Sequence, residues 1–283
     1  MLPRSISRSV RFISSENFKK QGYISPVTLF NEVEIKEIRD YVFKFEPKDG
    51  YPAQHLNPVL DHEFLWNKIS NCKNLMSLCE SIFESPNLMY FSSTLFTKYP
   101  SKDNLSKKFV GWHQDTYFWN VKPVENILTV WLALDRSTRE NGCMQVVPYN
   151  EFYGHGEHLE HDIVEDVNNT LMAYQDLNPE KFGGVERAVY IELEPGQASI
   201  HSGQAIHGSA PNLSKFRRSG LTIQLASTDL EIGEFKYDQL ELQAENVPEK
   251  DWRQPVLMKG NDLLKGHRKG IEVKKLPTHK FSH

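Results

Sequence analysis

The sequence has few cysteines, no long apolar run and no excess of charge of one sign. Only 3 of its 283 residues are cysteine and no two form a Cys-x-x-Cys pair, which argues against a disulfide framework. The apolar runs are only a few residues long, so we expect neither a membrane-spanning helix nor a membrane partner. The 33 basic and 37 acidic residues give a net charge of −4, which argues against a nucleic-acid partner.

The N-terminal segment, residues 1–15, is basic and contains Arg4, Arg8, Arg11 and several serines but no acidic residue. This composition is typical of a mitochondrial presequence, and equally of a mobile basic N-terminus. The segment leads directly into sequence with an ordered pattern at Phe18, which favours the second interpretation. We therefore predict a cytoplasmic protein with reduced cysteines, and the mitochondrial matrix is the alternative.

The pattern of apolar residues predicts one α+β domain over residues 1–283. Helical spacing is present in residues 31–46, where Asn31 and Glu34 form a capping-box pattern, and again in residues 61–83. From residue 89 onward, short β-rich runs are separated by turn residues. These runs span residues 89–98, 110–115, 127–135, 144–148, 189–193, 198–200 and 221–227. We expect a double-stranded β-helix, that is, a jelly-roll or cupin-like core, with flanking helices mainly from the N-terminal third.

Two further segments are expected to lie outside the core. Residues 151–182 are polar and irregular, which predicts a lid-like insertion between strands. Residues 259–283 are basic and are expected to form a mobile tail.

The motif His113-Gln114-Asp115 places an imidazole and a carboxylate two residues apart. In a strand these two side chains share one face. Two histidines and one carboxylate on one side of an Fe(II) ion leave the other positions open for substrate and oxygen. The motif supplies two of these three ligands, although by itself it is a weak signal.

A second motif begins at His207 and contains an arginine, Arg218, eleven residues later. A guanidinium group can hold a remote carboxylate through two parallel hydrogen bonds, which a lysine cannot reproduce. A dicarboxylic keto acid would then chelate iron at one end and bind the arginine at the other. Arg217 is the competing candidate for the arginine, and His201 for the histidine.

These motifs resemble those of the phytanoyl-CoA dioxygenase family of Fe(II)- and 2-oxoglutarate-dependent oxygenases, in its bacterial-type branch of small-molecule hydroxylases. The resemblance extends from Phe18 to about Ser227. Its most specific parts are WHQD at 112–115, TVWLALD at 129–135, ENGCMQVVP at 140–148 and HGSAPNLSKFRR at 207–218. The chain departs from the family pattern at 148–151, where it has Pro-Tyr-Asn-Glu, and this leaves the substrate preference open.

The resemblance implies a role for each matching residue. His113, Asp115 and His207 match the Fe(II) ligands. The residues matched to the 2-oxoglutarate site are Arg218, Ser209, Trp131, Gln114 and Thr94. The candidate substrate residues are Tyr117, Trp119, Arg217 and Lys108. The resemblance also implies O2 as co-substrate and ascorbate as a reductant that preserves activity.

The expected reaction is hydroxylation of an unactivated C–H bond in a small polar metabolite. In the family, halogenating relatives have a small residue at the position of Asp115, so a carboxylate there indicates a hydroxylase. We expect a small aminoalkylphosphonate such as 2-aminoethylphosphonate, whose phosphonate would need a further cation from Arg217, Lys108, Lys122 or Arg136. The alternatives are an amino acid, a compatible solute, a natural-product intermediate, or a non-catalytic jelly-roll protein that only binds metal or 2-oxoglutarate. The oligomeric state stays open.

One other histidine-rich motif is a candidate for a second metal site. His155, His158, His161 and Asp162 have a spacing that would place them on one helix face. Gly154 and Gly156 disfavour a helix there, so a solvated part of the lid is the preferred interpretation.

Overall fold

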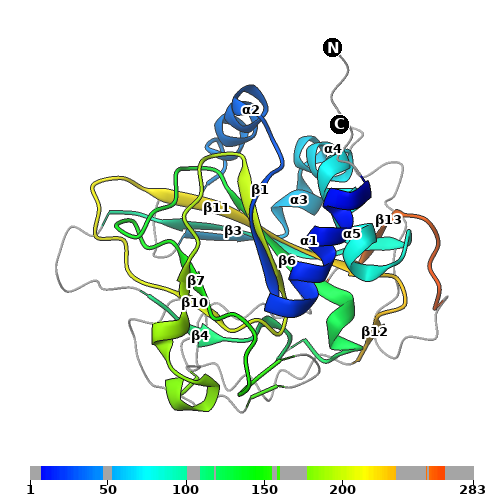
Figure 1. The fold of residues 1–283 in the computed structure, drawn as a ribbon. Helices are drawn as coiled ribbons and strands as arrows, with labels where there is room; N and C mark the ends of the chain where they lie inside the picture. The colour runs from blue at the N-terminus through cyan, green and yellow to red at the C-terminus, as the bar shows by residue number, and fades with distance from the viewer. Residues whose placement is uncertain are drawn as a thin grey trace.

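Two facing antiparallel sheets and a group of helices form the molecule in this computed structural model (Figure 1). It describes residues 8–46, 53–100, 109–117, 119–154, 158–159, 177–233, 253 and 255–264. The predicted α+β jelly roll is confirmed. None of the helices in these ranges is long and apolar enough to cross a membrane.

The helices come from the N-terminal third and cover the outer face of the larger sheet (Figure 1). They are α1 (Arg8–Gln21), α2 (Glu32–Val42), α3 (Pro58–Asp61), α4 (Glu63–Ser70) and α5 (Lys73–Phe83). The capping box at the start of α2 is confirmed, because Asn31 accepts from the N–H of Glu34 and the Glu34 carboxylate accepts from the N–H of Asn31. Two differences are that α2 ends at Val42, before the predicted Glu46, and that α1 begins at Arg8, inside the segment expected to be mobile.

The larger sheet has seven strands in the order β1-β9-β6-β11-β3-β13, with β2 also paired to β3. Their bounds are Tyr23–Thr28 for β1, Ala53–Leu56 for β2, Leu88–Lys98 for β3, Ile127–Ala133 for β6, Gln197–Ser202 for β9, Arg218–Ser227 for β11 and Val256–Lys259 for β13. The smaller sheet has the order β4-β10-β7-β8, with bounds Val110–His113, His207–Ser209, Met144–Val146 and Val189–Tyr190. A two-stranded sheet pairs β5 (Val121–Lys122) with β12 (Glu231–Ile232).

The alternation of side chains along the central strands separates a core face from a site face. Apolar residues such as Leu95, Val130 and Ile223 face the helices and form the main core. Their neighbours along the strands face the smaller sheet and include Lys98, Thr129, Arg218 and other polar residues. The space between the two sheets is therefore the place where a polar site can form.

Six strands were not predicted: β1, β2, β5, β10, β12 and β13. β10 is only the three residues His207, Gly208 and Ser209, so no alternation is visible in its sequence. β13 lies in a stretch that is charged and weakly periodic, and it ends on Lys259, the first residue of the expected tail. These strands exist because their backbones pair with neighbours, which local sequence does not show.

A buried carboxylate connects the turn after α2 to the outer face of the large sheet. Glu46 accepts hydrogen bonds from Thr97, Ser219 and Arg217. Removing one partner from a buried ion pair costs about 3 kcal/mol, so Glu46→Ala is expected to lower the free energy of unfolding by about that amount, as measured by urea denaturation. Glu194→Ala, which breaks an exposed pair with Arg136, should cost less than about 0.5 kcal/mol; equal effects of the two variants would contradict the interpretation.

Candidate metal centre

His113, Asp115 and His207 converge in the space between the two sheets. His113 on β4 lies opposite His207 on β10 in the strand register, and their ring centroids are 4.2 Å apart. The Nε2 atoms of His113 and His207 lie 3.5 and 3.6 Å from Oδ1 of Asp115. One ligand atom from each residue lies within 4.8 Å of the other two.

The local backbone differs from the predicted strand. β4 ends at His113, and Asp115 begins a 3-10 turn, Asp115–Tyr117. The His-x-Asp pair is therefore brought together by a strand followed by a turn, not by two residues on one face of a strand.

Hydrogen bonds around the three residues leave the right atoms available for a cation. The Nδ1 atoms of His113 and His207 lie 2.9 Å from the carbonyl oxygens of Gly111 and Ala205. These bonds place the ring proton on Nδ1 and leave Nε2 with a lone pair. Thr129 donates to Oδ2 of Asp115 at 2.6 Å, so that Oδ1 faces the histidines. The donor set of two imidazoles and one carboxylate fits non-heme Fe(II).

The protonation states also suit a cation. Burial, with a further contribution from His113, lowers the pKa of His207 to about 3, so its imidazole is neutral at physiological pH. Burial by itself would raise the pKa of Asp115, but the neighbouring imidazoles outweigh it and hold that pKa well below its usual range. The site therefore offers a carboxylate and a neutral histidine without the need to displace their protons.

His201, the competing histidine, lies on the other side of Asp115. Its Nε2 is 3.5 Å from Oδ2 of Asp115, the oxygen that Thr129 also contacts. It is not part of the group whose ligand atoms converge. The structure therefore places His207 at the site and His201 behind the carboxylate.

Arg218 and Lys98 lie at the far end of the same inner face. They are opposite one another in the register of β11 and β3, and both are buried. The Arg218 guanidinium lies over the ring of Trp131 at 5.2 Å and donates to the carbonyl oxygen of Gly142 at 2.5 Å. Lys98 donates to the Ser209 hydroxyl at 2.6 Å. Three of the residues predicted for the co-substrate, Arg218, Ser209 and Trp131, are thus grouped together.

Lys98 and Thr129 also contribute to the site, although neither was predicted from the sequence. Burial, with repulsion from Arg218, lowers the pKa of Lys98 well below its usual range. The available signal was strand alternation, because Lys98 shares a face with the predicted Thr94, and Thr129 with the predicted Trp131.

Two predicted substrate residues lie elsewhere. Arg217 points to the outer face, where it pairs with Glu46 and Asp135. Trp119 is packed against Phe91 in a separate apolar cluster. Adjacent residues of a strand face opposite sides, which explains why Arg217 and Arg218 diverge.

The remaining residues predicted for the co-substrate or the substrate differ in exposure and in their contacts. Tyr117 is exposed near the metal ligands, and Thr94 is half-buried on the inner face. Gln114 is buried and donates to the carbonyl oxygen of Gln204 while its side-chain oxygen accepts from the N–H of Leu159. Lys108 lies outside the described residues.

The histidine-rich motif is described only at His158. Its Nε2 is 2.9 Å from the Thr116 hydroxyl. His155, His161 and Asp162 lie outside the described residues. The described part of the motif therefore contacts the turn that carries Asp115.

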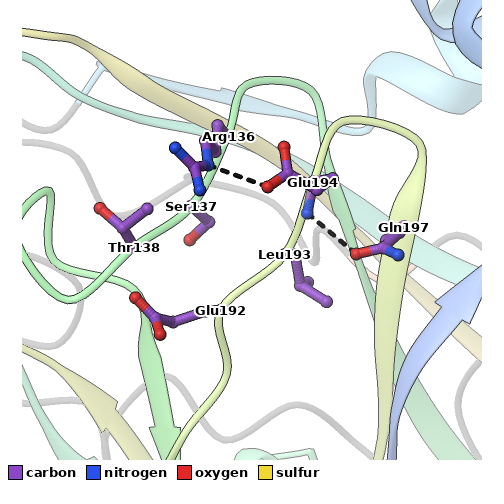
Figure 2. Close-up of a pocket in the computed structure, with 7 residues that line it drawn as sticks. All are labelled: Arg136, Ser137, Thr138, Glu192, Leu193, Glu194 and Gln197. Atoms are coloured by element: carbon purple, nitrogen blue, oxygen red, sulfur yellow. Dashed lines mark hydrogen bonds and ion pairs between the residues drawn. The ribbon is translucent and has the colours of Figure 1, made fainter.

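A separate surface cavity of about 120 Å³ contains Arg136, one of the cations considered for a phosphonate. Its other lining residues are Ser137, Thr138, Glu192, Leu193, Glu194 and Gln197. Figure 2 shows Arg136 paired with Glu194. The distance from Nε of Arg136 to Oε1 of Glu194 is 2.9 Å. Arg136 is therefore engaged at the surface.

Thr129 gives a direct test of how Asp115 is oriented. Thr129→Val removes the hydrogen bond to Oδ2 while keeping the shape of the side chain, and loss of such an outer partner typically weakens metal affinity by about 10–100-fold. We expect this loss in a competitive Fe(II) or Co(II) titration under anaerobic conditions. Thr138→Val, at the surface cavity, is the control; unchanged metal affinity in Thr129→Val would show that Asp115 is oriented without this bond.

The fold and the three converging side chains define a jelly-roll protein with a candidate two-histidine, one-carboxylate metal site. The chain belongs to the phytanoyl-CoA dioxygenase family, whose model matches residues 18–220. The predicted family is therefore confirmed.

Named relatives agree with this family. The chain is 28% identical over 194 residues to a probable phytanoyl-CoA dioxygenase of Caenorhabditis elegans, covering 67% of this chain and 59% of that protein. It is 28% identical over 171 residues to the 1-deoxypentalenic acid 11-beta-hydroxylase of Streptomyces arenae, covering 59% of this chain and 57% of that one. The match thus spans little more than half of either relative.

Solved structures share the fold. The epimerase SnoN in complex with Fe3+, alpha ketoglutarate and nogalamycin RO has a TM-score of 0.66 at 14% identity, covering 90% of this chain and 98% of that one. CytC3 with Fe(II) and alpha-ketoglutarate has a TM-score of 0.62 at 20% identity, with 95% of each chain covered.

Proposed function

We propose that the protein is an Fe(II)- and 2-oxoglutarate-dependent hydroxylase of a small polar metabolite. The observation that carries the proposal is one inner face that holds a His-Asp-His cluster and, further along, the buried guanidinium of Arg218. The reaction would convert substrate, 2-oxoglutarate and O2 into hydroxylated substrate, succinate and CO2. Bound iron would supply the activation of O2, and ascorbate would keep that iron reduced.

The protein's own residues would bind and orient the reactants. His113, Asp115 and His207 would hold the iron. Arg218 would bind the remote carboxylate of 2-oxoglutarate through its guanidinium fork. Trp131 would pack beside the chain of that co-substrate, because it already lies under the guanidinium.

Lys98 and Ser209 would complete the anion site. Two buried cations side by side are costly without a counter-charge, and Lys98 donates hydrogen bonds to the neutral oxygens of Ser209 and Ala210. A dicarboxylate would supply that counter-charge.

The carboxylate of Asp115 supports hydroxylation. Its Oδ1 faces the two Nε2 atoms at 3.5 and 3.6 Å, so the side chain fills a ligand position that a halide would otherwise need. Chlorinated product from the wild-type protein with chloride present would contradict this part of the proposal.

The substrate is proposed to be small and polar, and a neutral compound is favoured over 2-aminoethylphosphonate. Of the four cations considered for a phosphonate, Arg217 and Arg136 pair with carboxylates elsewhere, and Lys122 is exposed on β5. Lys108, outside the described ranges, is the candidate left for that role. Amino acids, compatible solutes and natural-product intermediates stay candidates.

The segment 151–182 is proposed to close over the site. Two of its described residues already contact the turn around Asp115, since His158 bonds Thr116 and the N–H of Leu159 donates to Gln114. Iron with 2-oxoglutarate is expected to slow proteolysis within 151–182. Equal protease sensitivity with and without them would argue against a lid.

Anaerobic titration tests the proposed function. Fe(II) followed by 2-oxoglutarate is expected to produce the weak visible charge-transfer band of the chelate, and O2 should then yield succinate. Absence of the band in folded protein that holds iron would contradict the proposal and favour a non-catalytic metal-binding protein.

A further inference from the structure

A row of polar side chains crosses the inner face of the large sheet beside the metal ligands. The strand register places Thr129 on β6 opposite Gln224 on β11, and Gln224 opposite Ser92 on β3. Residues directly opposite in antiparallel strands face the same side, and neighbouring strands are about 4.8 Å apart. Since Thr129 bonds Asp115, Gln224 and Ser92 lie one and two strands away from that contact and face the same space.

Solvent reaches this part of the inner face. Thr222 and Thr94, the neighbouring pair in the register, are half-buried although they lie in the middle of their strands. Their sequence neighbours Leu221, Ile223 and Leu95 are fully buried against the helices. Exposure of the two threonines must therefore come from the space between the sheets.

Gln224 presents a hydrogen-bond donor into this space. Ser92 donates to its Oε1 at 2.7 Å, and the two residues are 7% and 1% exposed. Among the described residues, the amide N–H2 of Gln224 has no hydrogen-bond partner. This amide nitrogen is not among the fully buried side-chain atoms without a partner in the described residues, so solvent reaches it, and a ligand oxygen can take the place of water as the acceptor.

The charged groups nearest to this donor are those that the proposed function assigns to iron and 2-oxoglutarate: Asp115 bonds Thr129 of the same row, and the Arg218 guanidinium lies over Trp131 of the adjacent row. The adjacent rows are Trp131, Thr222 and Thr94 on one side and Ile127, Ala226 and Met89 on the other. The backbones of Lys98 and Arg218 are each six residues further along their strands, which corresponds to about 20 Å, but the Arg218 side chain extends over the ring of Trp131 at 5.2 Å. A charged substrate group would therefore find, among the described residues of these rows and their contacts, no counter-ion other than Asp115 and Arg218, which the proposed function assigns to iron and 2-oxoglutarate.

We infer that Gln224, held in place by Ser92, binds a neutral carbonyl or hydroxyl oxygen of the substrate and so sets which substrates are accepted. The inference rests on the proposed function, because it places the substrate beside the proposed iron site. The amide would donate to that oxygen while the substrate carbon to be hydroxylated lies toward Asp115. The substrate class is thus a metabolite with a neutral oxygen at this contact.

The test measures binding of matched probes to protein loaded with Zn(II), which does not react with O2, and with 2-oxoglutarate. The probes are cyclohexanecarboxamide, cyclohexanemethanol, cyclohexanecarboxylate and cyclohexylmethylamine. Their binding is measured by ligand-observed NMR titration. Wild-type protein is expected to bind the two neutral probes at least about tenfold more tightly than the carboxylate, as one hydrogen bond to an unpaired donor allows.

Variants of Gln224 then test whether its side chain contacts the probe, and a control variant shows whether a glutamine-to-leucine change elsewhere alters binding. Gln224→Leu is expected to lose about tenfold in affinity for the neutral probes. Gln224→Glu is expected to change the preference toward the amine. Gln145→Leu, the same change on the outer face of β7, is the control and should bind all four probes as the wild type does.

Failure of the proposed function and failure of the inference about Gln224 give different results. If wild-type protein shows no charge-transfer band with Fe(II) and 2-oxoglutarate, the proposed function fails and this inference falls with it. If the band forms, three results would overturn the inference alone. These are no probe binding to the wild type, tightest binding of the carboxylate, or equal probe affinities in wild type and Gln224→Leu.

Discussion

Replacing Arg218 by leucine is expected to remove 2-oxoglutarate binding while leaving the metal ligands intact. The guanidinium lies buried over Trp131 at the far end of the site face. Each charge-assisted hydrogen bond to a carboxylate contributes about 1.5–3 kcal/mol, so losing two of them should raise the dissociation constant at least about 100-fold. The measurement is an anaerobic titration of iron-loaded protein with 2-oxoglutarate, in which binding is monitored through the charge-transfer band.

Arg217→Leu is the matched control, because the same substitution is made one residue away on the opposite face. Arg217 pairs with Glu46 and Asp135 outside the site. We expect a loss of stability, with 2-oxoglutarate affinity within about twofold of wild type, as is usual for independent sites. Equal loss of co-substrate binding in both variants would contradict the assignment of Arg218 as the residue that binds 2-oxoglutarate, or the proposed 2-oxoglutarate site itself.

His207→Ala is expected to abolish tight iron binding, and succinate formation with it. Its Nε2 is one of only three converging ligand atoms in the described part of the chain. Losing a direct ligand should weaken metal affinity by more than about 100-fold, which exceeds the effect usual for an outer partner. Equilibrium dialysis against Fe(II) under anaerobic conditions measures this loss.

His201→Ala distinguishes the two candidate histidines. His201 contacts Oδ2 of Asp115 from behind, so its removal should cost at most about 10–100-fold, as for other outer partners. Circular dichroism of both variants checks that the jelly roll is retained. A larger loss of iron in His201→Ala than in His207→Ala would exchange their roles.

The helices α2, α4 and α5 and most long strands could be predicted from the sequence, whereas α1 was not. α2 follows from the spacing of Ile35, Ile38 and Val42 and from its capping box, which are local signals. β3, β6 and β11 were found because they are long and rich in β-branched and apolar residues. β10 was missed because a strand of three residues owes its existence to its partners β4 and β7.

The site shows the same division. The motifs around His113 and His207 could be recognised in the sequence because metal ligands and a carboxylate-binding arginine need particular residue types at particular spacings. The contributions of Lys98 and Thr129 could not, because neither belongs to such a motif and each acts through a partner far away in the chain. The position of Trp119 in an apolar cluster could not be predicted for the corresponding reason, since the sequence does not distinguish an aromatic residue that packs in a core from one that faces a substrate.

By itself the sequence determined the family, the fold class and the identity of the converging metal ligands. Only the tertiary structure decided that Arg217 and Arg218 face opposite sides and that a turn after β4 places Asp115 beside His113. It also decided that Gln224 and Ser92 lie beside the metal ligands. The physical reason is that spacing along the chain fixes local conformation and residue chemistry. Which side chains share a space depends on strand register and sheet packing, and these are set by contacts between residues distant in sequence.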